Sequence, residues 1–240
     1  MVRCCRSVAR WLVLAAGITL WAQPVAGASR YDPALRFRAM RTPHFIIYFH
    51  QREEAVANRF AVIAEDVHEA LRARLQTTPA GRTHVILVDQ NDLANGWATP
   101  LPYNTIEITV APPAPRDVIG NTDDWLRLVF VHEYTHILQL DRSRGFASAL
   151  RAVFGRAPIS FPNLFLPTWQ IEGLATYEES ALTGRGRVNA PDFALFVTQA
   201  ARERRAFPLD RASSDSDDWP AGNTAGRTEQ NLWMWSLCAI

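Results

Sequence analysis

The motif His132-Glu133-x-x-His136 combines residue types that can hold a metal ion and move a proton. It lies in a stretch, 123–140, whose pattern predicts a helix. Helical residues four positions apart differ in direction by only about 40°, so both imidazoles project from one face, with a carboxylate beside them. Zinc suits this histidine pair best, and Glu133 could then act as a general base. The alternative is a buried helix that carries two histidines by chance, but unpartnered polar groups are costly to bury.

A zinc site built on two histidines needs a third protein ligand and, if it is catalytic, keeps a fourth position open. Glu172 is the candidate, because it lies 36 positions beyond His136 in a second predicted helix among apolar residues. Gly173 and Ala175 beside it would let the two helices approach closely. The alternative for Glu172 is an ordinary solvated glutamate.

Two further glutamates of the same helix, Glu178 and Glu179, are expected to be solvated. Cysteine is no alternative source of ligands. Cys4 and Cys5 fall in the N-terminal segment, and Cys238 is the remaining cysteine. We therefore expect no intrachain disulfide in the mature chain, and a metal held by histidine and carboxylate.

The N-terminal segment 1–28 has the features of a secretory signal peptide. Three arginines precede the apolar stretch 11–22, and Ala26-Gly27-Ala28 provides a small-x-small cleavage site. An uncleaved anchor is the alternative, but the apolar stretch is short for a bilayer. No other segment is apolar enough to cross a membrane, so we expect an exported protein, periplasmic or extracellular, with no transmembrane span after cleavage.

Composition narrows the class of protein further. The chain has 240 residues, 48% hydrophobic and 20% charged, which is typical of a globular protein and not of a disordered one. Its net charge is +1 and its arginines are not gathered into a basic face. Because nucleic-acid binders concentrate positive charge, we expect no nucleic-acid partner.

The region before the motif predicts a sheet lobe over about 44–121, preceded by an arm over 29–43 with weak structural signals. β-Branched and aromatic runs predict strands, and one apolar stripe predicts a helix. The predicted strands are 44–49, 84–88 and 104–110, and the predicted helix is 53–75. The strand 104–110 is the expected edge along which an extended peptide could pair, and the segment 89–102 is expected to be a loop with a turn at Asn95-Gly96.

Four histidines of this region, His44, His50, His68 and His84, are each isolated from other ligand-type patterns. We expect them to be surface or edge histidines.

The motif and the region after it predict an active-site and helical lobe over about 122–240. Helices are expected at about 146–154, from Pro167 onward, and at 190–207, with an acidic loop at 213–218. The apolar end, 231–240, predicts that the chain ends before this lobe is complete.

Taken together, the motif and the later stretch Trp169-x-x-Glu172-Gly173-x-Ala175-x-Tyr177 resemble the gluzincin metallopeptidases. The closest likeness is to the peptidase-MA-like domains of secreted bacterial proteins, over about 45–187. The resemblance implies an α+β, zincin-like fold: a small twisted mixed sheet, an active-site helix and a helical C-terminal part. It also implies Zn²⁺ held by His132, His136 and Glu172, with Glu133 as the catalytic general base.

The chain departs from the gluzincin pattern at the group that stabilises the oxyanion. No histidine follows His136, and Tyr177 is the only tyrosine after Glu172. Tyr177 lies about 140° around the helix from Glu172, so we expect it to face away from the metal. Arg185 and Arg187 are candidates to replace it electrostatically.

These features together predict a secreted zinc-dependent metallopeptidase acting on a peptide or protein substrate. One alternative is a non-catalytic zincin-like module for binding or envelope assembly, with an envelope-associated partner. A second alternative is a metal-dependent hydrolase of a substrate other than a peptide.

Overall fold

A computed structural model of the chain describes residues 31–90, 94–114 and 121–204. The predicted signal peptide, the acidic segment 213–218 and the apolar end 231–240 lie outside the described residues. The chain divides into two units, Met1–Leu35 and Arg36–Ile240. Every helix and strand below belongs to the second unit.

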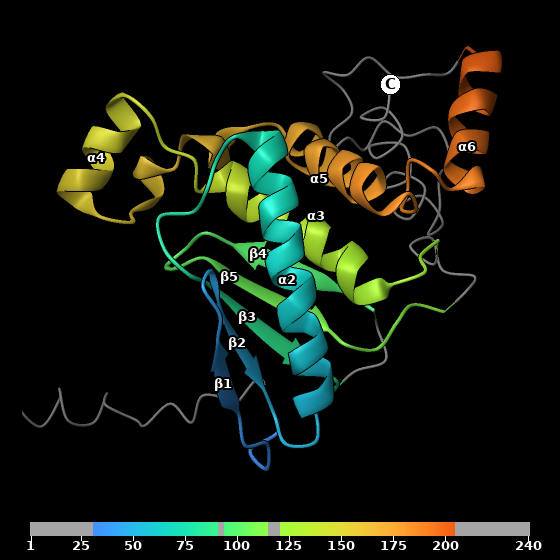
Figure 1. Ribbon diagram of the computed structural model, residues 1–240. Coiled ribbons are helices and arrows are strands. Elements are labelled where there is room, and N and C mark those ends of the chain that lie inside the picture. Colours follow the sequence, from blue (N-terminus) through green and yellow to red (C-terminus); the bar gives the residue numbers. More distant parts are fainter. Residues whose placement is uncertain (1–30, 91–93, 115–120, 205–240) are drawn as a thin grey trace, which may run out of the picture. The chain divides into compact units, whose positions relative to one another are not determined.

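The strands form one five-stranded sheet in the order β1-β2-β3-β5-β4 (Figure 1). The strands are β1 (Arg38–Arg41), β2 (Phe45–Phe49), β3 (Thr83–Val88), β4 (Gly96–Thr99) and β5 (Thr105–Thr109). The central strands β2, β3 and β5 run parallel, while β1 and β4 pair antiparallel with their neighbours. The sheet is therefore mixed, and the predicted α+β class is confirmed at this level.

The two outer strands correct the sequence predictions. β4 lies where a loop and an Asn95-Gly96 turn were expected, and β1 lies in the predicted arm. The predicted edge strand, β5, is an interior strand between β3 and β4. The sequence signal was weak because neither β1 nor β4 alternates between buried and exposed residues. The unpaired edge on this side of the sheet therefore belongs to β4.

The helices agree better with the predictions. They are α2 (Glu54–Leu75), α3 (Trp125–Leu140), α4 (Phe146–Phe154), α5 (Thr168–Thr183) and α6 (Pro191–Arg202). Two short 3₁₀ turns, Pro158–Ser160 and Pro162–Phe165, connect α4 to α5. None of the helices in the described ranges has the length and apolar character that crossing a membrane requires.

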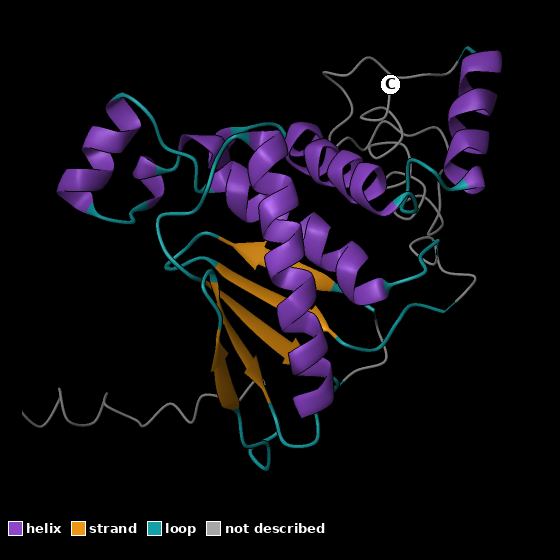
Figure 2. Cartoon of the chain, viewed as in Figure 1, coloured by secondary structure: helices purple, strands orange, loops and turns teal. Residues whose placement is uncertain are grey.

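The core lies between the sheet and the helices α2 and α3, which pack against each other and against the sheet (Figure 2). Phe130 of α3 sits at its centre, with ring centroids 5.4 Å from Phe45, 5.0 Å from Phe60 and 5.3 Å from Tyr134. α3 also contacts α5 on its other side. Because it has neighbours on both sides, every residue of α3 except Arg127 and Gln139 is buried.

Replacing Phe130 with alanine tests this core. Phe130→Ala should lower the free energy of unfolding by about 3–5 kcal/mol, because it leaves a cavity among aromatic rings. Val62→Ala on α2 is the control, since Val62 is 65% exposed, and it should change stability by less than about 0.5 kcal/mol. Urea unfolding followed by circular dichroism measures both. Equal losses in the two variants would contradict the packing described here.

Candidate metal centre

The two helices that carry the predicted ligands lie side by side. α3 begins at Asp124, whose side chain accepts a hydrogen bond from the backbone N–H of Arg127. α5 begins after Pro167, and its small residues Gly173 and Ala175 are buried. α5 is in close contact with α3.

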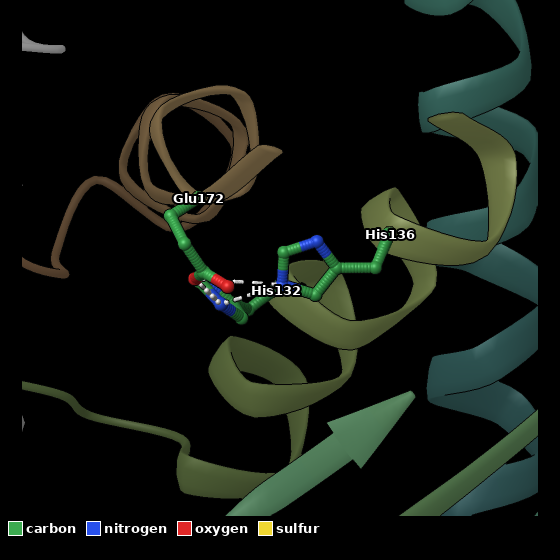
Figure 3. Close-up of side chains that lie close together, drawn as sticks. All are labelled: His132, His136 and Glu172. Atoms are coloured by element: carbon green, nitrogen blue, oxygen red, sulfur yellow. Dashed lines mark hydrogen bonds and ion pairs between the residues drawn. The ribbon is translucent and has the colours of Figure 1, made fainter. Parts of the chain in front are cut away.

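The structure brings together the three predicted ligands. His132 and His136 point from α3 toward Glu172 on α5 (Figure 3). The two Nε2 atoms are 3.1 Å apart. Glu172 Oε2 lies 3.4 Å from Nε2 of His132 and 3.6 Å from Nε2 of His136. Ligands of a tetrahedral zinc ion, each about 2.0–2.1 Å from the metal, are about 3.3 Å from one another. The three atoms therefore have the spacing that one zinc ion requires.

The tautomer of His132 also fits a metal ligand. Its Nδ1 lies 2.9 Å from Glu179 Oε2 and 3.0 Å from Nη2 of Arg187, and a protonated Nδ1 donates to the carboxylate. When His132 is neutral, that proton position leaves the lone pair of Nε2 directed at the other two ligand atoms. A carboxylate that orients a metal-binding imidazole in this way is common at metal sites.

Glu179 is the functional residue that the sequence analysis missed. It was expected to be solvated, as was Glu178, but both are buried. Arg187 donates to Glu179 through Nε at 2.8 Å, through Nη2 at 2.7 Å and through its backbone N–H at 3.1 Å. Glu179 follows Glu172 by seven positions, about two helical turns, so both side chains share one face of α5. From this spacing, the sequence could have indicated that Glu179 lies on the same side of the helix as the predicted ligand.

The other charged candidates lie elsewhere. Glu178 forms an ion pair with Arg74 of α2. Arg185 pairs with Asp123 at 2.8 Å, which makes it a poor substitute for the oxyanion group. Tyr177 is half-exposed, with the Arg74 guanidinium over its ring, and it is absent from the residues that line the cavity at the ligands. The prediction that Tyr177 faces away agrees with this placement.

Without a bound ion, a proton on His132 is the positive charge between Glu172 and Glu179. Burial and the Arg187 charge disfavour a charged His132, but hydrogen bonds to Glu172 and Glu179 outweigh them and raise the pKa of His132 to about 9. Burial also opposes ionisation of Glu172, yet hydrogen bonds with His132 and His136 hold its pKa far below the usual range. Glu179 is buried as well, but Arg187 and His132 lower its pKa to about 2. Both carboxylates are therefore ionised at neutral pH.

The ligands face a cavity of about 450 Å³. The carboxyl group of Glu133 is buried at this cavity, and burial raises its pKa. The walls come from β4, α3, α5 and the segment after α5. The lining residues are Asn95, Gly96, Trp97, Ala98, Trp125, Leu128, Val129, His132, Glu133, His136, Thr168, Glu172, Glu179 and Arg187.

Gly96 of β4 lies against Glu133. A Cβ atom at Gly96 would be 2.7 Å from Cγ2 of Val129 and 2.8 Å from both Cγ and Oε1 of Glu133. These distances are shorter than carbon and oxygen atoms tolerate without displacement. The absence of a side chain at Gly96 therefore allows β4 and α3 to approach each other.

The remaining histidines lie outside this cluster. His44 and His84 are partly exposed, as predicted. The expectation is wrong for His68 and His50, which are both buried. His68 Nδ1 is 2.6 Å from the hydroxyl of Tyr134, and His50 contacts two carboxylates. Both lie on or beside regular elements, whose packing the local sequence does not reveal.

Comparison with known proteins yields no match to a family model, to a curated protein or to a solved structure.

Replacing Gly96 with alanine should destabilise the protein. Gly96→Ala forces a methyl group against Val129 and Glu133, and overpacking of this kind costs about 1–3 kcal/mol. Gly81→Ala is the matched control, because a Cβ at Gly81 would meet no atom within 4 Å, and its effect should stay within about 0.5 kcal/mol. Thermal and urea unfolding measure the difference. A Gly96→Ala protein as stable as the control would contradict the close approach of β4 and α3.

Replacing Glu179 with glutamine should weaken zinc binding. Glu179→Gln removes the charge that orients His132, and such changes cost roughly 10–100-fold in metal affinity. Glu178→Gln is the control, since Glu178 is also buried on α5 but pairs with Arg74. Competition with a chromogenic zinc chelator measures both affinities. Equal affinities in the two variants would show that Glu179 has no part in orienting the imidazole.

Proposed function

We propose that this chain is an exported zinc-dependent metallopeptidase of the gluzincin type, which hydrolyses peptide bonds. The observation that carries the proposal is the convergence of His132, His136 and Glu172 with Glu133 buried in the same cavity. The three ligands leave one side toward the cavity, as a catalytic zinc site requires. The signal peptide expected at 1–28 provides the basis for export.

Zinc held by these ligands would acidify a water molecule and polarise the scissile carbonyl. Glu133 is placed to act as the general base, and its carboxylate would accept a proton from the attacking water and deliver it to the leaving amine. Burial raises the pKa of Glu133, which strengthens it as a base, and general bases work best when their pKa approaches the operating pH. The backbone of Gly96 lies close to the side chain of Glu133. His132 is oriented for the metal by Glu179, which Arg187 keeps ionised.

Strand β4 is the proposed platform for the substrate. It is the outer strand of the sheet, pairs on one side with β5, and contributes Gly96, Trp97 and Ala98 to the cavity. An extended peptide can add to such an edge through backbone hydrogen bonds, which tolerate many sequences. Apolar residues of the same cavity, including Trp125 and Leu128, would take side chains of the peptide.

The arrangement of elements supports a zincin-like fold for the proposed enzyme. A mixed sheet ends in the antiparallel strand β4, α3 lies against that strand, and α5 supplies the third ligand. We also propose that the chain consists of a sheet lobe and a helical lobe that meet at the metal. The proposed relatives of this fold are the peptidase-MA-like domains.

A second candidate function is a non-catalytic zincin-like module with an envelope-associated partner. The observation that favours it is the state of Arg187, whose guanidinium already donates twice to Glu179. Arg187 therefore has limited capacity to stabilise an oxyanion as well. Among the described residues that line the cavity there is no tyrosine.

Replacing Glu133 with glutamine tests the peptidase function. Glu133→Gln should bind zinc as the unmodified chain does but cleave peptides roughly 10²–10⁴-fold more slowly, because the general base is lost. His136→Gln should lose both zinc and cleavage, while Glu178→Gln should retain both. Zinc content is measured by atomic emission, and cleavage of a mixed peptide library by mass spectrometry.

Two outcomes would contradict the proposal. Cleavage that persists in Glu133→Gln would exclude Glu133 as the base. Full zinc content without peptide cleavage in the unmodified chain would favour the binding module, or a hydrolase of another substrate class if ester or glycoside probes are cleaved.

A further inference from the structure

A second group of side chains that could bind a metal ion lies at the N-terminal end of α2. His50 directly follows β2, Asp89 directly follows β3, and Glu53 is the residue before α2. β2 and β3 are parallel, so their carboxyl ends meet at one edge of the sheet. The topology thereby brings three residues together that are far apart in the sequence, and one ligand atom of each lies within 4.8 Å of the others.

The tautomer of His50 places its free nitrogen between the carboxylates. Its Nδ1 lies 3.0 Å from the carbonyl oxygen of Gln51, which can only accept a hydrogen bond, so Nδ1 carries a proton. Nε2 then faces Asp89 Oδ1 at 2.7 Å and Glu53 Oε2 at 3.4 Å. A neutral His50 would direct a lone pair at two negative oxygens, which is unfavourable unless a cation lies between them.

Glu53 provides an independent observation. Its side chain is 6% exposed, and its Oε2 is buried without a hydrogen-bond partner among the described residues. Glu53 occupies the N-cap position of α2, yet its side chain caps no backbone N–H. A buried carboxylate oxygen that accepts no hydrogen bond is costly, and the neighbour of Oε2 is Nε2 of His50 at 3.4 Å. The site therefore contains a buried ligand atom whose contact with His50 is attractive only when the imidazole is protonated or when a cation lies between them.

We infer that His50, Glu53 and Asp89 form a second divalent-cation site, for which Zn²⁺ is the best match. One imidazole and two carboxylates suit zinc, whereas calcium and magnesium prefer oxygen ligands throughout. The separation of 3.4 Å between His50 and Glu53 agrees with the spacing of about 3.3 Å around a tetrahedral zinc ion. Asp89 is 51% exposed, so its carboxylate can shift to ligand distance and the ion has access from solvent.

A zinc ion there would join the ends of β2 and β3 to the start of α2. The site uses no residue of the His132–His136–Glu172 cluster, so it does not rest on the peptidase proposal. The metal-free rival is an imidazolium shared by both carboxylates. Burial opposes the charge on His50, but hydrogen bonds to Gln51 and Asp89 and the nearby carboxylates raise its pKa, so protons and zinc compete for the same gap.

Zinc stoichiometry distinguishes the two states. The whole chain is dialysed against buffered Zn²⁺ at pH 8 and its bound metal is counted. The unmodified chain should bind two ions, His136→Gln should bind one, and Glu53→Gln/Asp89→Asn should bind one. Asp89→Asn alone is the second variant in case the double variant does not fold, and it should also lose the second ion. Asp66→Asn, at an exposed position of α2, is the control and should bind two.

Three results would overturn the second site. The first is that the unmodified chain binds a single ion and that His136→Gln loses it. His50 would then be an imidazolium between the two carboxylates. The second is that folded Asp89→Asn and the double variant both keep two ions. The second ion would then bind elsewhere. Loss of an ion in Asp66→Asn would show that the effect is not specific to Asp89.

Discussion

The burial of α3 is the constraint on which the rest of the structure depends. This helix is packed against the sheet and α2 on one side and α5 on the other, so its polar residues His132, Glu133 and His136 have little access to water. Polar groups in such a place require partners within the protein or a bound ion. The two imidazoles find one anion, Glu172, and one orienting carboxylate, Glu179. The three ligand atoms converge on one point and His132 is held by a carboxylate, which is the arrangement that a bound cation requires. This geometry supports the metal hypothesis.

A chain of contacts between oppositely charged groups runs from α3 to the segment after α5. His132 contacts Glu172 with one nitrogen and Glu179 with the other. Arg187 closes the arrangement from the segment after α5 and gives a buried carboxylate the positive partner that it requires. If the cluster binds a metal as proposed, we expect its affinity to depend on Glu179 and Arg187 as well as on the ligands. The same commitment of Arg187 limits what it can contribute to a reaction, which is the physical basis for considering a binding module as well.

The sheet contributes in two ways. Its antiparallel edge strand β4 forms one wall of the cavity, and Gly96 allows this wall to come within contact distance of Glu133. At the carboxyl ends of β2 and β3, the parallel arrangement gathers His50, Glu53 and Asp89. Both sites thus use a general property of sheets: strands far apart in sequence place their ends or edges side by side.

The sequence by itself determined the elements whose signals are local. Helical spacing fixed the common face of His132 and His136, and apolar periodicity located α2, α3 and α4 with errors of at most two residues. Glu172 was found because a histidine pair requires a third ligand and the residues around it are apolar. Each of these inferences needs only a few neighbouring residues and the geometry of a helix.

The tertiary structure decided what depends on pairing over long distances. β4 was missed because an outer strand shows no alternation of buried residues, and β5 was placed wrongly because its neighbours cannot be deduced from its own sequence. Glu179 was expected to be solvated because its partners, His132 and Arg187, come from other segments. Likewise, His50 was judged isolated, since Asp89 lies 39 residues away. In each case the free energy comes from contacts that exist only once the chain has folded, so the local pattern does not identify the partner residues.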